Sequence, residues 1–206
     1  MAGPNQPKPS SAPPRMPRQS RPGPFRCICI SLLLFIIVIG IAILITWLII
    51  RPTPLDYTIE DAKIHNFNIS SNNVLNATFN LTIKSYNNNH KVGLWYDSMD
   101  ITIWYDKQML AFADVSPFFQ RKRNETTLHV DTGAVATPLM TSVAKKFKSD
   151  RSSGDVELVV KLNARIRFKV GAIKSKHYEM AVDCSPVVVH FSPTTPFDRV
   201  PCDVDV

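Results

Sequence analysis

The chain has 206 residues and a formal net charge of +7, but its charge and its prolines are unevenly distributed. Eight of the 16 prolines and five cations without an acid fall in the first 26 residues, whereas residues 51–206 carry 19 basic and 17 acidic side chains. The excess positive charge therefore belongs mainly to a short tail. This distribution argues against a nucleic-acid-binding domain, so no nucleic-acid partner is expected.

Residues 1–26 are predicted to form a disordered, cytosolic tail. They are rich in proline, contain few large apolar side chains, and carry the cations Lys8, Arg15, Arg18, Arg21 and Arg26. A segment of this composition cannot bury enough apolar surface to fold by itself. Its cations favour contact with anionic lipids on the cytosolic side of a membrane.

Residues 28–50 form an apolar stretch of 23 positions without a charged side chain. As an α-helix this stretch is about 35 Å long, which is enough to cross a hydrocarbon core of about 30 Å. A cleaved signal peptide has a shorter apolar core, of about 7–15 residues, followed by a small-residue cleavage site. We therefore predict that residues 27–50 form an uncleaved transmembrane signal-anchor helix.

The flanks of this stretch predict its orientation. Cations without acids precede it, whereas Asp56, Glu60 and Asp61 follow it closely. Short basic segments stay in the cytosol, so residues 51–206 are expected on the extracytosolic side. The four N-x-Ser/Thr sequons lie on that same side, and we predict glycosylation sites at Asn68, Asn76, Asn80 and Asn124.

The four cysteines divide in the same way. Cys27 and Cys29 lie at the cytosolic edge of the predicted anchor, where S-palmitoylation and simple apolar packing are both open. Cys184 and Cys202 lie in the oxidising compartment as an isolated pair, so a disulfide between them is expected.

Residues 51–206 show a two-residue hydrophobic period that predicts strands with one buried face. Apolar and polar side chains alternate from Leu75 to Ile83 and again from Val156 to Val170. One segment has helical spacing instead, beginning at Thr137-Pro138 as an N-cap and first helical residue. The pattern predicts a mostly β fold, an antiparallel β-sandwich with one short helix.

Two surface features of this domain are candidates for partner binding. The polar face of the strand 156–170 carries Lys161, Arg165, Arg167 and Lys169, which is either a solvated strand face or a face for an acidic partner such as anionic polysaccharide. An aromatic cluster is either core packing or a platform on which sugars stack; it comprises Trp95, Tyr96, Trp104 and Tyr105.

Catalytic and cofactor motifs are absent from the sequence. It contains no G-x-S-x-G, H-E-x-x-H, P-loop or G-x-G-x-x-G pattern, and its five histidines have no ligand spacing. We therefore expect no enzymatic activity, no metal and no cofactor.

Three short segments follow the predicted anchor in order. The first is Asn87-Asn88-Asn89 with Tyr96-Asp97. The second is the segment 117–120, with Pro117, Phe118 and Gln120, and the third is the segment 165–171, with Arg165, Arg167, Phe168 and Gly171. Together these segments resemble the plant NDR/HIN-like (NHL) proteins, which carry the group-two late embryogenesis abundant domain; Asn88 stands where that family has proline.

This resemblance implies a seven-stranded sandwich similar to immunoglobulin and fibronectin III domains, behind a single-pass anchor. It also implies a plasma-membrane protein with an apoplastic domain, enriched at plasmodesmata in some members, that acts in defence and stress responses. We hypothesise a non-enzymatic protein that binds protein partners in defence signalling. The alternative is a module that binds cell-wall polysaccharide or another glycan at plasmodesmata and affects cell-to-cell transport.

Overall fold

The computed structural model describes residues 24–50, 53–192 and 195–206. The tail predicted for residues 1–26 lies outside these ranges except for its last three residues. The chain divides into two compact units, Met1–Ile49 and Ile50–Val206, and each is described by itself.

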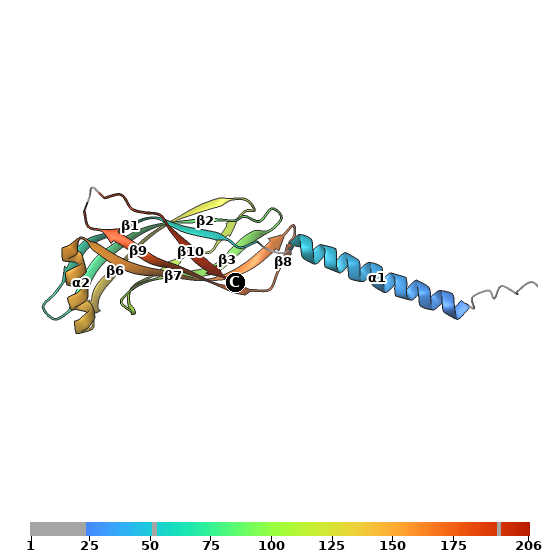
Figure 1. Cartoon of the computed structure of the whole chain (residues 1–206), viewed down its shortest axis with the longest axis horizontal. Coiled ribbons are helices and arrows are strands. Elements are labelled where there is room, and N and C mark those ends of the chain that lie inside the picture. Colours follow the sequence, from blue (N-terminus) through green and yellow to red (C-terminus); the bar gives the residue numbers. More distant parts are fainter. Residues whose placement is uncertain (1–23, 51–52, 193–194) are drawn as a thin grey trace, which may run out of the picture. The chain divides into compact units, whose positions relative to one another are not determined.

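The first unit contains one helix, α1, from Pro24 to Ile50 (Figure 1). Within it, Phe25–Ile45 has a mean hydropathy of 3.4 and no buried side chain, so it is long and apolar enough to cross a membrane. The helix begins three residues before the predicted anchor. Proline is favourable in the first turn, where its missing N–H is not needed.

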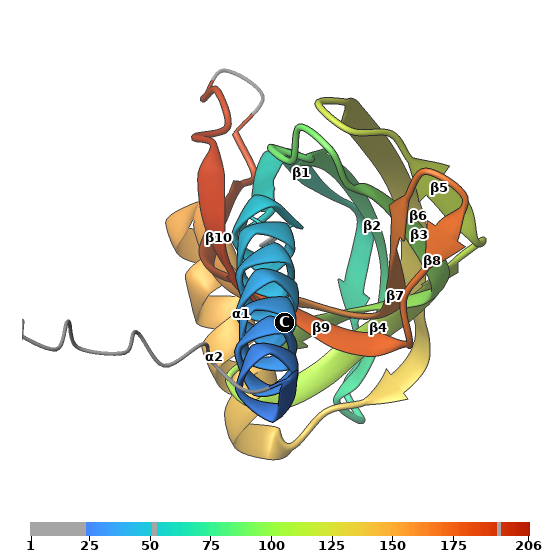
Figure 2. The same ribbon diagram turned by 90° about the vertical axis from the view of Figure 1, so that its right-hand side faces the viewer.

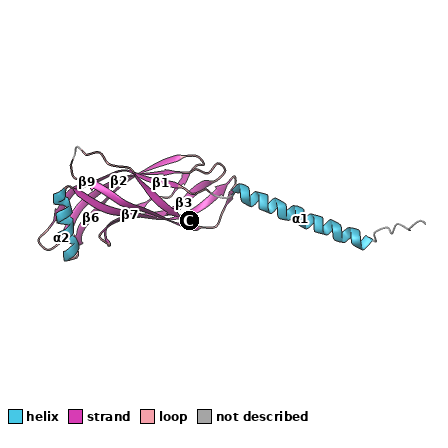
Figure 3. Ribbon diagram, viewed as in Figure 1, coloured by secondary structure: helices cyan, strands magenta, loops and turns pink. Residues whose placement is uncertain are grey.

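The second unit is mostly β (Figure 3). Its ten strands are β1 (Asp56–Ile69), β2 (Val74–Tyr86), β3 (Gly93–Tyr105), β4 (Gln108–Val115), β5 (Phe118–Gln120), β6 (Glu125–Pro138), β7 (Asp155–Val170), β8 (Ile173–Lys174), β9 (Tyr178–His190) and β10 (Val200–Asp205). One helix, α2 (Thr141–Ser153), separates β6 from β7.

The predicted alternation of β7 is confirmed. Eight apolar side chains alternate with other residues from Val156 to Val170. The first six of them are buried, and the last two, Phe168 and Val170, are half-buried. Strand β2 likewise buries Leu75, Ala77, Phe79, Leu81 and Ile83. These stripes form the core, because every second side chain of a strand points to the same face.

The prediction of a seven-stranded sandwich is wrong. The strands form one antiparallel sheet in the order β4-β3-β7-β9-β10-β1-β2-β6, with β5 beside β3 and β8 beside β7. Figure 2, which looks along the strands, shows the sheet curled into a nearly closed barrel. Its two edges meet where Thr132 Oγ1 of β6 donates to the carbonyl O of Phe112 in β4 at 2.6 Å.

Strand β10 joins the two halves of the barrel. Its first residues pair with β1, with Cys202 opposite Tyr57, and its last residues pair with β9, with Asp203 opposite Asp183. The disulfide between Cys184 and Cys202 links β9 to β10 where β10 changes partner. The expected cysteine pair therefore fastens a short strand that holds the sheet together, for a chain-entropy gain of about 3 kcal/mol.

The helix begins three residues later than predicted. Thr137 and Pro138 end β6, where they pair with Leu75 and Val74, and the N-cap of α2 is Met140, without a side-chain cap. The helix buries Val143, Ala144 and Phe147, which recur at helical spacing, whereas Met140 is exposed.

Candidate functional site: the Thr53 end of the domain

Two loops meet at one end of strands β3 and β7. Gly93 at the start of β3 pairs with Lys169 near the end of β7, which brings the loops 87–92 and 171–177 together. Helix α2 lies at the other end of both strands: it immediately precedes β7, and its Phe147 stacks on the Tyr105 ring that ends β3. A strand of 13 residues separates the two ends by about 40 Å.

A third loop and the start of the domain lie at the same end. Strand β5 runs along the first residues of β3, so the following loop 121–124 reaches this end. There the N–H of Arg123 donates to the carbonyl O of Asn89 at 3.2 Å, and Asn89 in turn contacts Thr53. We call this part of the domain the Thr53 end.

Asn87 and Asn89, from the first family segment, tie these loops together. Asn87 Nδ2 donates to the carbonyl oxygens of Val92 at 3.0 Å and Arg121 at 3.1 Å, and Asn87 Oδ1 accepts the N–H and the Nδ2–H of Asn89. Both asparagines are buried, at 0% and 4% exposure. Because unpaired buried amides are costly, these bonds fix the loops in one arrangement.

Asn88, where the family has proline, makes a contact that proline could not. Its Nδ2 donates to Oδ2 of Asp56 at the start of β1. The substitution therefore adds one exposed polar link between the loop and β1, while the buried asparagines on either side keep their bonds.

Next to the asparagines lies a buried polar cluster of Tyr57, Ser85, Tyr96 and Gln120. The two tyrosine hydroxyl oxygens are 2.8 Å apart, and the Tyr96 hydroxyl donates to Gln120 Oε1 at 3.1 Å. Gln120 Nε2 donates to the carbonyl O of Ser85 at 3.0 Å. Burial raises the pKa of Tyr57 and of Tyr96, so both phenols stay neutral.

Sequence reasoning missed Tyr57, Ser85 and Thr53 as members of this site. A signal for one of them was present, because Ser85 and Asn87 continue the inward positions of the run that begins at Leu75. Two polar residues at successive inward positions indicate a buried hydrogen-bonded cluster. Within the described residues, every buried side-chain N or O atom has a hydrogen-bond partner.

The remaining residues of the second family segment support this cluster. The Phe118 ring stacks on Tyr96 with ring centroids 4.3 Å apart and an angle of 14° between the ring planes. Pro117, just before β5, is exposed. A Cβ on Gly93 would lie 2.7 Å from Cζ of Phe119, so the Phe119 ring packs over a glycine and would have to shift if this residue had a side chain.

The third family segment supplies the ion-pair partner of the first. Arg167 Nε donates to Asp97 Oδ2 at 2.8 Å, and its Nη2 donates to Asp97 Oδ1. His177 Nε2 lies 3.4 Å from the same carboxylate. The hydrogen bonds from Arg167 hold the pKa of Asp97 below its usual range.

Phe168 and Gly171, also from the third segment, shape the hairpin that follows. The Phe168 ring lies 5.3 Å from Tyr178. Gly171 has φ +58°, a left-handed conformation that glycine adopts without strain.

Two of the four cations on the candidate partner face of β7 are neutralised by acids within the domain. Lys161 Nζ lies 2.8 Å from Asp183 Oδ2, Arg167 is paired with Asp97, and Lys169 Nζ lies 5.1 Å from the centroid of the Phe119 ring. Arg165 is exposed, and no ion pair with an acid is found for it within the described residues. Of the four predicted cations, Arg165 and Lys169 therefore have no ion pair with an acid within the described residues.

The aromatic cluster divides between the two faces of β3. Tyr96 and Tyr105 are buried, whereas Trp95 and Trp104 are half-buried on the outer side. Burial and the hydrogen bond to Asp150 raise the pKa of Tyr105. The four rings do not share one surface, so they do not form the coplanar platform considered above.

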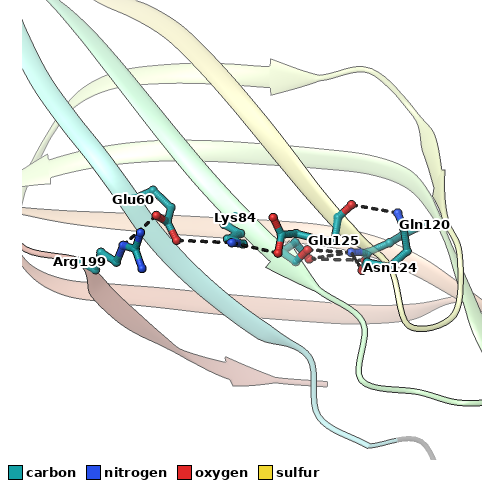
Figure 4. A network of polar contacts seen from close by, with 7 residues as sticks. Glu60, Lys84, Gln120, Asn124, Glu125 and Arg199 are labelled. Atoms are coloured by element: carbon teal, nitrogen blue, oxygen red, sulfur yellow. Dashed lines mark hydrogen bonds and ion pairs between the residues drawn. The ribbon is translucent and has the colours of Figure 1, made fainter.

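On the outer surface of the barrel, charged side chains cross four successive segments (Figure 4). Arg199 Nε lies 2.9 Å from Glu60 Oε2, and Lys84 Nζ lies 3.9 Å from Glu60 Oε1 and 2.9 Å from Glu125 Oε2. In the same view, Gln120 Nε2 donates to the carbonyl O of Asn124 at 3.2 Å. These partly exposed pairs add alignment to β1, β2 and β6 rather than much stability.

The predicted modification sites lie at separate places. Asn68, Asn76 and Asn124 are exposed, whereas Asn80 is half-buried and its Nδ2, the atom to which a glycan is attached, donates to Asp131. Asn76 and Asn80 share the outer face of β2. Cys27 and Cys29 are exposed in α1 as free thiols.

The acids offer no arrangement with evident chemistry in the described part of the chain. Asp100 faces Asp114 across β3 and β4, and its burial and this neighbour raise its pKa. Within the described residues, no group of three His, Cys, Asp or Glu side chains is placed to hold a metal ion.

The profile of the family "Late embryogenesis abundant protein" matches residues 82–184. The uncharacterized protein At1g08160 of Arabidopsis thaliana is 34% identical over 185 residues, which cover 88% of this chain and 84% of that protein. NDR1/HIN1-like protein 3 from the same plant is 31% identical over 176 residues, or 82% and 75% of the two chains.

A further relative, NDR1/HIN1-like protein 1 of Arabidopsis thaliana, is 28% identical over 164 residues and 78% of each chain. The first segment of the resemblance, the Asn87–Asn89 loop with Tyr96 and Asp97, and the second, Pro117–Gln120, lie within the matched residues, as does the third. The chain therefore belongs to the plant NDR1/HIN1-like proteins that carry the late embryogenesis abundant domain.

Proposed function

We propose that this chain is a single-pass plasma-membrane protein that acts in plant defence and stress responses through protein partners of its apoplastic domain. Helix α1 is the anchor, the N-terminal tail is cytosolic, and the domain binds rather than catalyses. The N-terminal apolar helix and the family of stress and defence proteins to which the chain belongs support this proposal.

The observation that supports the proposal most strongly is that residues of the family segments form structural contacts within the domain. Asn87, Asn89, Tyr96 and Gln120 are buried and form hydrogen bonds that fix the loops. Asp97 forms an ion pair with Arg167. Segments that hold a rigid scaffold in this way are typical of a domain whose exposed surface binds partners.

Proximity labelling at native expression in plant cells tests the proposal. A labelling enzyme fused to the C-terminus of the full chain should modify apoplastic and membrane proteins that change after a defence stimulus. The Ile166→Asp variant, which removes the fold, is the matched control. Labelling of cytosolic proteins, or the same set of proteins with both chains, would contradict the proposal.

A glycan-binding module at plasmodesmata has less support. Trp95 is the outer ring best placed for sugar stacking, but Lys174 Nζ lies 4.7 Å from its centroid and covers a face of the ring. Binding of cell-wall polysaccharide that is lost on Trp95→Ala, with the fold unchanged, would favour this second function.

A further inference from the structure

The loops of the Thr53 end carry a concentration of positive charge. The segments 87–92, 121–124 and 169–177 contain seven cations and no acid; they are Lys91, Arg121, Lys122, Arg123, Lys169, Lys174 and Lys176. All are exposed except Lys169, which is half-buried. The other 12 basic and 17 acidic side chains of residues 51–206 leave the rest of the domain negative. These loops are therefore a basic surface on a domain whose remaining side chains carry a net negative charge.

This charge is not neutralised by the domain itself. Within the described residues none of the seven cations forms a salt bridge with an acid; Lys174 and Lys176 instead lie over the rings of Trp95 and Tyr178. Of the acids nearby, Asp97 is paired with Arg167, Glu125 with Lys84, and Asp56 accepts a hydrogen bond from Asn88. The surface is thus available to an anionic partner.

The same end exposes apolar side chains among the cations. Ile173, the first residue of β8, is 75% exposed, and Phe119 in β5 is 36% exposed. Trp95 lies 5.7 Å from Phe119, with Lys169 and Lys174 over the two rings. Aromatic and aliphatic side chains interspersed with lysines are the combination that enters the headgroup region of a bilayer.

We propose that the Thr53 end binds anionic lipid headgroups of the extracytosolic leaflet, the leaflet that faces the domain. Thr53 follows Ile50 of the apolar helix by only three residues, which span at most about 11 Å when fully extended. The bilayer entered by that helix is therefore within reach of these loops. An acidic polysaccharide would satisfy the lysines, but it would not require Ile173 and Phe119 to be exposed. The inference rests on the proposed membrane anchoring.

The test uses the full chain in lipid nanodiscs, with a nitroxide label on Ile173→Cys in a Cys27→Ser, Cys29→Ser background. The label at 173 should contact oxygen dissolved in lipid rather than a water-soluble nickel chelate when the disc contains phosphatidylserine. A label on Val135→Cys, which is also apolar and 83% exposed but lies on β6 near α2, should stay in water. Phosphatidylcholine alone should give weaker burial of the label at 173.

Charge reversal separates electrostatic binding from simple proximity. Each cation removed near an anionic surface weakens association about five-fold, so Lys91→Glu, Lys122→Glu and Lys174→Glu together should return the label at 173 to water. The matched control reverses three exposed lysines at the α2 end, Lys107, Lys145 and Lys148, and should leave the label in lipid.

The outcomes distinguish this inference from the anchor on which it rests. A chain that fails to enter nanodiscs contradicts the anchor. A chain that enters them, but keeps the label at 173 in water with and without phosphatidylserine, overturns the inference. The inference is also overturned if polygalacturonate protects the loop lysines from an amine reagent while the label at 173 stays in water.

Asn124 provides an independent check, because it lies in the loop 121–124 and a glycan there would occupy the same surface. In contrast to the glycosylation predicted from its sequon, the peptide that contains Asn124, isolated from the full chain made in plant cells, should be unglycosylated. A glycan at Asn124 on most molecules would overturn the inference.

Discussion

The side chain of Asn89 holds the backbone of Thr53 as a neighbouring strand would. The N–H of Thr53 donates to Asn89 Oδ1 at 2.8 Å, and Asn89 Nδ2 donates to the carbonyl O of Thr53 at 3.0 Å. Asn89 itself is held by Asn87 through bonds to its N–H and its Nδ2. The first family segment therefore fixes the point at which the chain enters the domain.

Asn89→Ala should lower the free energy of unfolding by about 1–3 kcal/mol, because it leaves partly buried backbone groups of Thr53 without partners. The measurement is thermal unfolding of the full chain in detergent micelles, followed by circular dichroism. Asn88→Ala is the control and should have a smaller effect, since it loses one exposed hydrogen bond to Asp56. Equal losses in the two variants would contradict the role assigned to Asn89.

Two arginines on the same face of β7 should respond differently to charge reversal. Arg167→Glu breaks a partly buried pair and places two carboxylates together, so it should cost about 1–3 kcal/mol of unfolding free energy. Arg165→Glu should change stability by less than about 0.5 kcal/mol, as is usual for an exposed substitution. Chemical denaturation of both variants checks this, and a similar loss in both would show that the Asp97–Arg167 pair adds nothing.

The same pair predicts a dependence of stability on pH. Because the folded-state pKa of Asp97 is lowered, its contribution is fully present above its unfolded pKa of about 3.9 and is lost as the pH falls through the lower folded value. The difference in melting temperature between the wild type and Asp97→Asn should therefore shrink as the pH falls below about 4. A difference that is constant with pH would rule out this linkage.

Ile166→Asp should unfold the domain. Ile166 is fully buried, and an unpaired carboxylate there costs several kcal/mol against a total stability of about 5–15 kcal/mol. Asn163→Asp places the same carboxylate on the outer face of the same strand and should keep the cooperative melt. If Ile166→Asp melts like the wild type, the assignment of the buried face of β7 is wrong.

Strands with strict alternation could be predicted from the sequence, and β7 is the clearest example. Strands with irregular pairing could not. In β1 the register with β2 shifts twice, and Asn66 has φ +52°, so no simple period is left in the sequence. Strand β10 joins the two halves of the sheet but could not be predicted, because it contains Pro201 and its valines are only partly buried.

The start of α2 was predicted wrongly because strand pairing overrides the local preference of these residues for a helix start. Thr137-Pro138 has the chemistry of a helix start, but the pairing of Thr137 with Leu75 extends β6 through both residues. The number of strands and the closure of the barrel depend on contacts such as Thr132 to Phe112, which no local pattern records.

Only part of the candidate site could be predicted, because its residues come from distant parts of the sequence. The family segments marked Asn87, Asn89, Tyr96 and Gln120, but their partners Thr53, Tyr57 and Ser85 become neighbours only in the fold. The cations of the Thr53 end also come from three separate loops. Each loop by itself has the composition of an ordinary solvated turn.

The central claim is a folded domain held outside the cytosol by α1, and protease protection in sealed plant microsomes tests it most directly. With one epitope tag at each end of the full chain, external protease should remove the N-terminal tag and spare a C-terminal fragment. That fragment should gain mobility on deglycosylation and keep Cys184 and Cys202 closed to alkylation without reductant. Loss of the C-terminal tag, with protection of the N-terminal one, would contradict the account.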